Sequence, residues 1–311
     1  GRGGCTGIGP IWYNEGMRTP GIKSVVAPAC LFLLSSSLAV PAAVWGPAPI
    51  AEVVALDALG TLPTKLYFHG DPSNDEQYLL ELVNRGRSDP YNECKLMLDS
   101  HDPAIDQAIV GYRVDIRKLF ADFASYAPKP PLALNPKLSE AARIQAQDMA
   151  THDFQDHIGS DGSTLADRFT RVGYPFIYGG ENVFAYAQSV FSAEAAFLID
   201  WGVPDLGHRI NLLDLGDHTG FREIGLCILS ESKPATMVGP LVVAQEFGLA
   251  SQSTVFITGV VYRDKNGNNF YDPGEGLGGV QIMPDSGDYY AVTGASGGYT
   301  IPVSTRSGRY I

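Results

Sequence analysis

Apolar residues recur at helical spacing soon after the first quarter of the chain. The run from Leu79 to Val83 predicts a helix over 75–87. Asn74 or Asp75 can cap its start, and Pro90 is expected to end it. A second stretch, 103–126, has a partly helical period.

Three more helices are expected further on. Asn135 is a suitable cap and Pro136 suits a first helical position, so a helix should continue to about His152. Helices are also predicted over 164–172 and 192–201, separated by a loop rich in Gly and Tyr.

After residue 222 the period changes to that of strands. Residues 223–229 and 236–247 are apolar and rich in β-branched residues, which predicts two paired strands. Helices followed by strands indicate an α+β domain over about 74–249. From 252 to 311 only short strands are expected, at 255–262, 280–283, 289–293 and 298–303. This pattern is typical of a small β-sandwich, which we expect to be truncated.

The charge balance excludes one class of partner. Asp and Glu number 34 against 22 Lys and Arg, a net charge of −12, which repels a nucleic-acid backbone. An acidic exported protein is instead a natural host for Ca²⁺.

Residues 1–42 are interpreted as upstream sequence and a signal peptide. A basic start after Met17 precedes an apolar stretch, and small residues allow cleavage after Ala42. A membrane anchor is the alternative, but Pro28 and three serines interrupt the stretch before about 18 apolar residues accumulate. We therefore expect export to the cell surface or beyond, with no stable membrane span. Residues 43–73 are interpreted as a linker.

Cys94 and Cys227 remain in the mature chain. An oxidising compartment permits them to pair, but the sequence does not place their Cα atoms, so two buried thiols are an equal alternative.

Three short motifs follow one another in the α+β region. They are His157-x-x-x-Asp161-Gly162, Gly180-Glu181-Asn182 and Gly207-His208-Arg209. In this order the chain resembles the bacterial branch of the CAP superfamily (SCP/PR-1-like, cysteine-rich secretory proteins) over about residues 76–248. The resemblance implies an α/β/α sandwich with a surface cleft where two histidines and two acids converge.

Carried over, the cleft residues are His157, Glu181, Asp200 and His208. Asp200 stands where the family has a glutamate, one methylene longer. The two imidazoles could bind Zn²⁺ with carboxylates orienting the rings, or all four groups could form a structural hydrogen-bond network. A site with two histidines lacks a third strong protein ligand.

Catalysis is the less favoured interpretation. Ser160 and Ser163 lie near His157 in sequence, but neither stands in a Gly-x-Ser-x-Gly elbow. CAP domains are better supported as binding modules, so we expect a cleft that takes a lipid, a glycan, another cell-envelope component or a metal. The alternatives are a metal-assisted extracellular hydrolase or protease with Glu181 as general base, and a purely structural head on an adhesive protein.

A second motif lies in the C-terminal region. Oxygen-bearing side chains recur at positions 1, 3, 5, 9 and 12 of the loop 264–275, the spacing of a Ca²⁺ loop. These predicted ligands are Asp264, Asn266, Asn268, Asp272 and Glu275. Position 6 is Asn269, which tolerates left-handed backbone angles. The region resembles the SdrD B-like or Cna B-like repeats of bacterial surface adhesins; a polar turn that binds nothing is the alternative.

Overall fold

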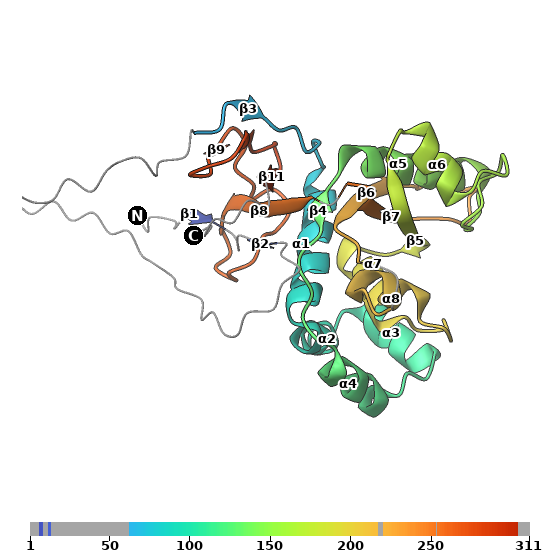
Figure 1. Ribbon diagram of the computed structural model, residues 1–311. Coiled ribbons are helices and arrows are strands. Elements are labelled where there is room, and N and C mark those ends of the chain that lie inside the picture. Colours follow the sequence, from blue (N-terminus) through green and yellow to red (C-terminus); the bar gives the residue numbers. More distant parts are fainter. Residues whose placement is uncertain (1–5, 9–11, 14–61, 217–219, 253, 304–311) are drawn as a thin grey trace, which may run out of the picture.

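The computed structural model describes residues 6–8, 12–13, 62–216, 220–252 and 254–303. The expected signal peptide lies outside these residues. The described part of the chain forms eight helices and three sheets, so the predicted α+β class is correct (Figure 1). The helices are α1 Asn74–Ser88, α2 Pro90–Asp99, α3 Pro103–Gly111, α4 Ile116–Ser125, α5 Pro136–His152, α6 Leu165–Arg171, α7 Val190–Ile199 and α8 Gly207–Leu213.

The strands fall into one central sheet and two others, which combine the C-terminal strands with β1, β2 and β3. The central sheet has the order β4-β6-β7-β5, and the others β3-β10-β9 and β1-β8-β11, with β2 also paired to β8. Their bounds are β1 Thr6–Ile8, β2 Trp12–Tyr13, β3 Lys65–Leu66, β4 Ala133–Leu134, β5 Phe176–Ala187, β6 Glu223–Ser230, β7 Leu241–Ala250, β8 Val255–Arg263, β9 Gln281–Ile282, β10 Tyr289–Val292 and β11 Gly298–Val303.

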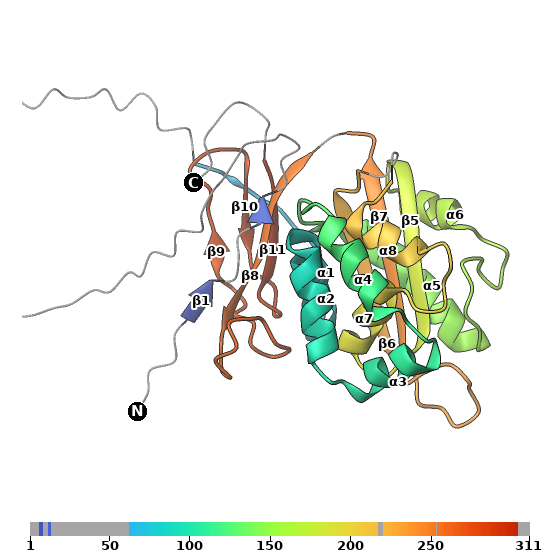
Figure 2. The ribbon, with the colours of Figure 1, turned by 90° about the horizontal axis from the view of Figure 1, so that it is seen from below.

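Residues 74–250 build three layers, called here the α/β/α part. Helix α5 covers one face of the central sheet, and α1, α7 and α8 lie against the other (Figure 2). Neighbouring strand residues alternate between the faces: Leu226 belongs to the core under α1 and α7, and Cys227 to the core under α5. Both faces are buried, which explains why β6 and β7 are almost continuously apolar.

Helix starts follow from local chemistry. Asn135 caps α5 by accepting from the amides of Lys137 and Leu138, as expected. At α1 the cap is Ser73, which forms a capping box with Glu76, so the expected cap at Asn74 or Asp75 is wrong. Asp89 caps α2, and Pro90 is the first residue of that helix. Helix α1 ends two residues earlier, at Ser88.

Several segments differ from the sequence prediction, among them helices α2 and α8, which it does not include. The stretch 103–126 is two helices, α3 and α4, separated by four residues. The expected Gly- and Tyr-rich loop around Gly179 and Gly180 is part of β5, the long edge strand of the central sheet. Residues 62–73, within the expected linker, include β3, which pairs in parallel with β10.

Residues 255–303 form the β part, in which β8 pairs with β11 and β10 with β9. It lies beside α1 (Figure 1). Cys94 and Cys227 are both fully buried free thiols in the α/β/α part, which resolves the alternative between pairing and burial.

Candidate functional site: two histidine–carboxylate pairs

The first pair joins the loop after α5 to the edge strand β5. His157 Nδ1 lies 2.7 Å from Glu181 Oε1. The imidazole is 56% exposed, whereas the Glu181 side chain is 3% exposed. The hydrogen bond to Glu181 raises the pKa of His157 above its usual value, although partial burial opposes this. The His157 ring is therefore exposed to solvent while a buried carboxylate fixes its orientation.

The buried guanidinium of Arg168 binds the carboxylate of Glu181. Arg168 of α6 is fully buried, and its Nη2 donates to Glu181 Oε2 at 2.5 Å and to the carbonyl of His157 at 3.2 Å. Glu246 of β7 pairs in register with Glu181, and its carboxylate lies 3.7 Å from Arg168 Nε. Burial and the neighbouring Glu181 raise the pKa of Glu246, so that carboxyl group favours its protonated form.

Arg168 and Glu246 were missed by the sequence analysis. The sequence feature that could have identified Glu246 is its position inside the apolar run of β7. A carboxyl group that faces a core needs a polar partner. The sequence does not indicate that Arg168 is this partner, because α6 and β7 are far apart in the chain and come together only when it folds.

The second pair forms where α7 ends. Asp200 takes a left-handed conformation, with φ of 61°, and its Oδ1 lies 2.7 Å from His208 Nδ1. Its other oxygen accepts from the backbone amide of Arg209 at 3.0 Å. The His208 ring packs against Phe197, with centroids 5.3 Å apart. The shorter Asp200 side chain thus reaches its histidine even without the methylene of the family's glutamate.

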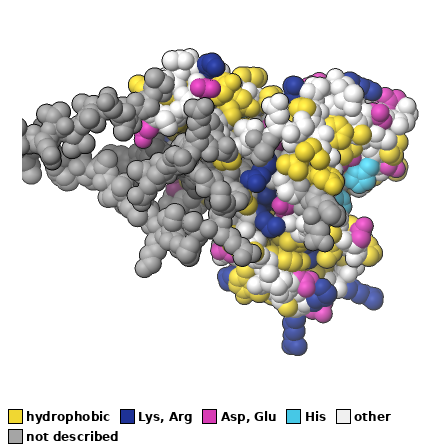
Figure 3. All heavy atoms as spheres, in the orientation of Figure 1, with side chains coloured by type: hydrophobic (Ala, Val, Ile, Leu, Met, Phe, Trp, Pro, Cys, Tyr) yellow, Lys and Arg dark blue, Asp and Glu magenta, His cyan; other side chains and the backbone are white. Residues whose placement is uncertain are grey.

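Two asparagines connect the pairs. Asn182 Nδ2 donates to the carbonyl of His208 at 3.3 Å, and Asn211 Nδ2 donates to the carbonyl of Glu181 at 3.2 Å. The Gly-Glu-Asn segment of β5 therefore lies directly against α8, which starts at the Gly-His-Arg segment. Figure 3 shows histidine side chains at the indentation between the α5–α6 region and the α7–α8 region.

Both pairs use the same ring nitrogen. Each histidine gives Nδ1 to a carboxylate, which leaves Nε2 for a ligand. This arrangement is typical of histidines that bind metals, because the carboxylate fixes the tautomer and the ring orientation. However, within the described ranges no group of three or more His, Cys, Asp or Glu side chains could hold a metal ion. The donor set therefore offers two imidazoles, and a bound ion would need further ligands from outside the chain.

The hydroxyl of Ser160, near His157 in sequence, is bonded outside the two pairs. Ser160 Oγ donates to Asp148 Oδ1 at 2.6 Å, and Ser160 N donates to the same carboxylate. Asp148 also contacts His152 Nδ1 at 2.7 Å. Ser160 thus belongs to a separate surface cluster, and nothing in its contacts activates it as a nucleophile.

The predicted Ca²⁺ loop folds around its own oxygens. Asp264 accepts from the amides of Gly267 and Asn269, and the carboxylate of Glu275 accepts from Lys265 N and Asp272 N. The side-chain amides of Asn266 and Asn268 both donate to Asp272 Oδ2 at 2.7 Å. All five predicted ligands therefore take part in one local network. Asn269 has φ of 61°, which confirms the expected left-handed position.

The match to a protein-family model covers all three motifs. Residues 80–217 match the model of the cysteine-rich secretory protein family, CAP. No curated protein matches the chain. A solved structure of an extracellular protein containing an SCP domain from Bacillus anthracis is similar at 23% identity, with a TM-score of 0.29, over 42% of this chain. The match spans 39% of that protein. By its match to the family model, the chain carries a CAP domain over residues 80–217.

Proposed function

We propose that the protein is exported and that its CAP domain is a non-catalytic binding module. The cleft formed by His157, Glu181, Asp200 and His208 would take a metal ion such as Zn²⁺, or the polar group of a lipid or glycan from the cell envelope. In the part of the chain that the structure describes, no helix is long and apolar enough to cross a membrane.

One observation carries this proposal: each histidine is oriented by a buried carboxylate and keeps its Nε2 for a ligand. Side-chain exposures of 56% for His157 and 21% for His208 leave both rings accessible, whereas Glu181 and Asp200 are inaccessible. Carboxylates so deeply buried orient the rings and do not meet the ligand themselves. Bound Zn²⁺ would accept the two Nε2 lone pairs and act as a Lewis acid toward its remaining ligands.

The contacts of Glu181 weigh against the hydrolase alternative. A general base must reach the water whose proton it takes. Glu181 already shares one oxygen with His157 and the other with Arg168, and its side chain is 3% exposed. Catalytic zinc sites also use three protein ligands, one more than the two imidazoles provide.

Metal analysis tests the proposal. We expect the purified full chain, after exposure to Zn²⁺ and gel filtration, to retain about one ion, and His157→Ala and His208→Ala each to reduce retention at least tenfold. His152→Ala is the matched control, because this ring is 55% exposed and also contacts a carboxylate through Nδ1. Equal zinc content in the double variant and the wild type would exclude the two rings as ligands. Zinc-dependent hydrolysis of ester or peptide substrates would favour the alternative.

We also propose that the loop 264–275 binds Ca²⁺ and that the β part is an SdrD B-like spacer carrying the CAP domain. Asp264, Asp272 and Glu275 place three carboxyl groups in the loop 264–275, and each accepts hydrogen bonds from other groups of the loop. The amides of Asn266 and Asn268 face Asp272 through nitrogen, and a half-turn would present their oxygens to a cation. The response of the unfolding temperature to Ca²⁺ tests this second proposal.

A further inference from the structure

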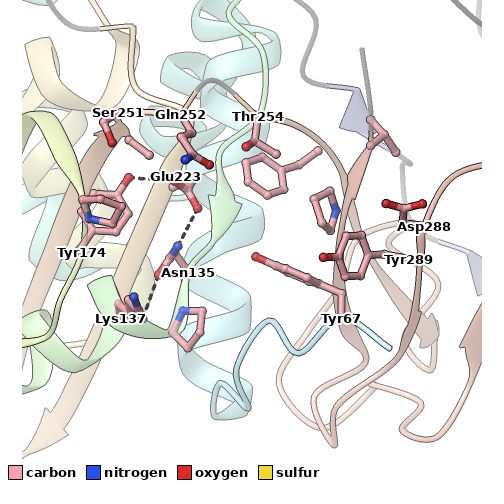
Figure 4. A pocket seen from close by; sticks show the side chains of 16 residues that line it. Tyr67, Asn135, Lys137, Tyr174, Glu223, Ser251, Gln252, Thr254, Asp288 and Tyr289 are labelled. Carbon is pink, nitrogen blue, oxygen red and sulfur yellow. Dashed lines mark hydrogen bonds between the residues drawn. The ribbon is translucent and has the colours of Figure 1, made fainter. Parts of the chain in front are cut away.

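A large cavity lies between the α/β/α part and the β part. Its volume is about 830 Å³, and its lining includes Tyr67, Asn135, Tyr174, Glu223, Asp288 and Tyr289. None of the four cleft residues lines it. Figure 4 shows side chains from both parts facing one space.

One wall carries a buried carboxyl group between neutral donors. Glu223, the first residue of β6, is 6% exposed. Its Oε1 accepts from Asn135 Nδ2 at 2.6 Å and its Oε2 from Tyr174 OH at 2.8 Å. Among the described residues Glu223 makes no salt bridge, so its charge has no cationic partner within the structure. Each carboxylate oxygen retains a second lone pair for a ligand.

The opposite wall is aromatic. Tyr67 and Tyr289 pack edge to face, with ring centroids 5.7 Å apart, across the cavity from Glu223 (Figure 4). Tyr289 already carries an ammonium group on its ring, since Lys65 Nζ lies 5.7 Å from the centroid. These rings therefore form a surface of the kind that attracts organic cations through the negative face of the π system.

The charged side chains of the lining favour the same kind of ligand. Glu223 and Asp288 are the acidic residues of the lining and Lys137 is the basic one, while the Lys65 ammonium lies on the Tyr289 ring. The ammonium of Lys137 is engaged with the carbonyl of Gly173 at 2.7 Å. An anionic ligand would meet a buried carboxylate, whereas a cation would compensate it.

We propose that this cavity binds a ligand with a substituted ammonium group, whose charge meets Glu223 and whose carbon substituents pack on the tyrosine rings. The site is separate from the histidine cleft and does not depend on the function proposed for it. The ammonium group could belong to a small soluble molecule or to a lipid headgroup, and the chemistry of recognition is the same.

Choline and its uncharged isostere 3,3-dimethylbutan-1-ol test the proposal by calorimetric titration of the full chain. We expect choline to bind, and the isostere to bind at least tenfold more weakly. Glu223→Gln keeps the shape of the side chain and should weaken choline binding at least tenfold. The matched control is Glu231→Gln, because Glu231 is also 6% exposed but lies at the other end of β6, outside the cavity lining.

A second variant guards against a folding defect in the first. Tyr289→Leu leaves the carboxyl group in place and removes one aromatic face, so choline binding should fall several-fold while the circular dichroism spectrum stays unchanged. Sedimentation with phosphatidylcholine vesicles separates the two sources of ligand: co-sedimentation supports a headgroup, and choline binding without it supports a soluble cation. No choline binding, equal binding of the isostere, or binding of an uncharged N-acetylglucosamine trimer in place of choline would overturn the proposal.

Discussion

Glu194 is a buried acid in the core whose protonation should control stability. It is fully buried on α7, its Oε2 accepts from Gln245 at 3.0 Å, and its Oε1 has no hydrogen-bond partner. Burial raises its pKa from 4.5 to about 8. The folded state therefore keeps this proton at neutral pH, whereas the unfolded chain loses it above pH 4.5. Stability should fall as pH rises from about 4.5 to about 8.

We expect Glu194→Gln to remove this loss of stability with rising pH. At pH 7.5 the variant should be more stable by on the order of 2 kcal/mol, and at pH 4.5 the two proteins should differ little. Urea denaturation at both pH values measures the difference. Glu140→Gln, on the exposed face of α5, should show no such pH dependence. A wild type whose stability is constant between pH 5 and 8 would contradict the expected proton uptake.

The sequence also identified the two histidines and the carboxylates that orient them, but not the residues that pack around Glu181. His157, Glu181 and His208 stand in short motifs, and the family resemblance assigns Asp200 as the acid ahead of His208. Arg168 and Glu246 act through burial beneath Glu181, and neither belongs to a motif. Burial depends on which elements pack together, so such partners cannot be found from local sequence.

At the scale of elements, the contact between α5 and β6 depends on one glycine. A Cβ atom at Gly225 would lie 1.9 Å from the carbonyl carbon of Leu138 and 2.1 Å from the amide nitrogen of Ser139. These are backbone atoms, so the whole helix would have to move. We expect Gly225→Ala to destabilise the fold by about 3 kcal/mol or more, measured by thermal or urea unfolding.

Gly111→Ala is the control for this substitution. Nothing lies within 4 Å of a Cβ built at Gly111, at the end of α3, so this change should be neutral or slightly stabilising. If Gly225→Ala were equally neutral, α5 would not pack on β6 as closely as the structure indicates.

Local features of the chain explain why some elements were predicted wrongly. Gly179 and Gly180 suggested a loop, but both lie in β5. Glycine is needed there because a Cβ at Gly179 would meet Phe169 and one at Gly180 would meet Asn211. Helix α8 has seven residues and no side-chain cap, so it gives no start signal. The long helices α1 and α5 were predictable because caps and apolar period agreed.

At the scale of the whole molecule, α1 belongs to both parts. One of its faces lies in the main core, and another meets the loop 264–275. The Phe270 ring lies 4.0 Å from the Arg85 guanidinium carbon and 6.1 Å from the Tyr78 ring. Tyr271 is 1% exposed, and its hydroxyl lies 3.4 Å from Asn74 Oδ1. Ordering the loop should therefore also order α1.

Ca²⁺ bound in the loop 264–275 should stabilise this contact with α1. If the loop binds the ion, Ca²⁺ at about 100 times its dissociation constant should stabilise the folded state by about 2.7 kcal/mol and raise the unfolding temperature. Hydrogen exchange of the α1 amides should slow at the same time. Asp264→Asn keeps an oxygen that can accept from Gly267 but removes a charge, so it should abolish both effects.

Two comparisons separate ion binding from its transmission to α1. Asp285→Ala, a change to an exposed acid of the β part outside the loop, should leave the response to Ca²⁺ intact. Phe270→Ala preserves the five predicted ligands but removes the ring that stacks on Arg85, so the temperature shift should persist while exchange in α1 becomes insensitive to Ca²⁺. An unfolding temperature that is the same with Ca²⁺ and with chelator would show that the loop is a polar turn that does not bind the ion. The contact with α1 would then persist without an ion, through the Phe270 ring on Arg85 and the Tyr271 hydroxyl on Asn74.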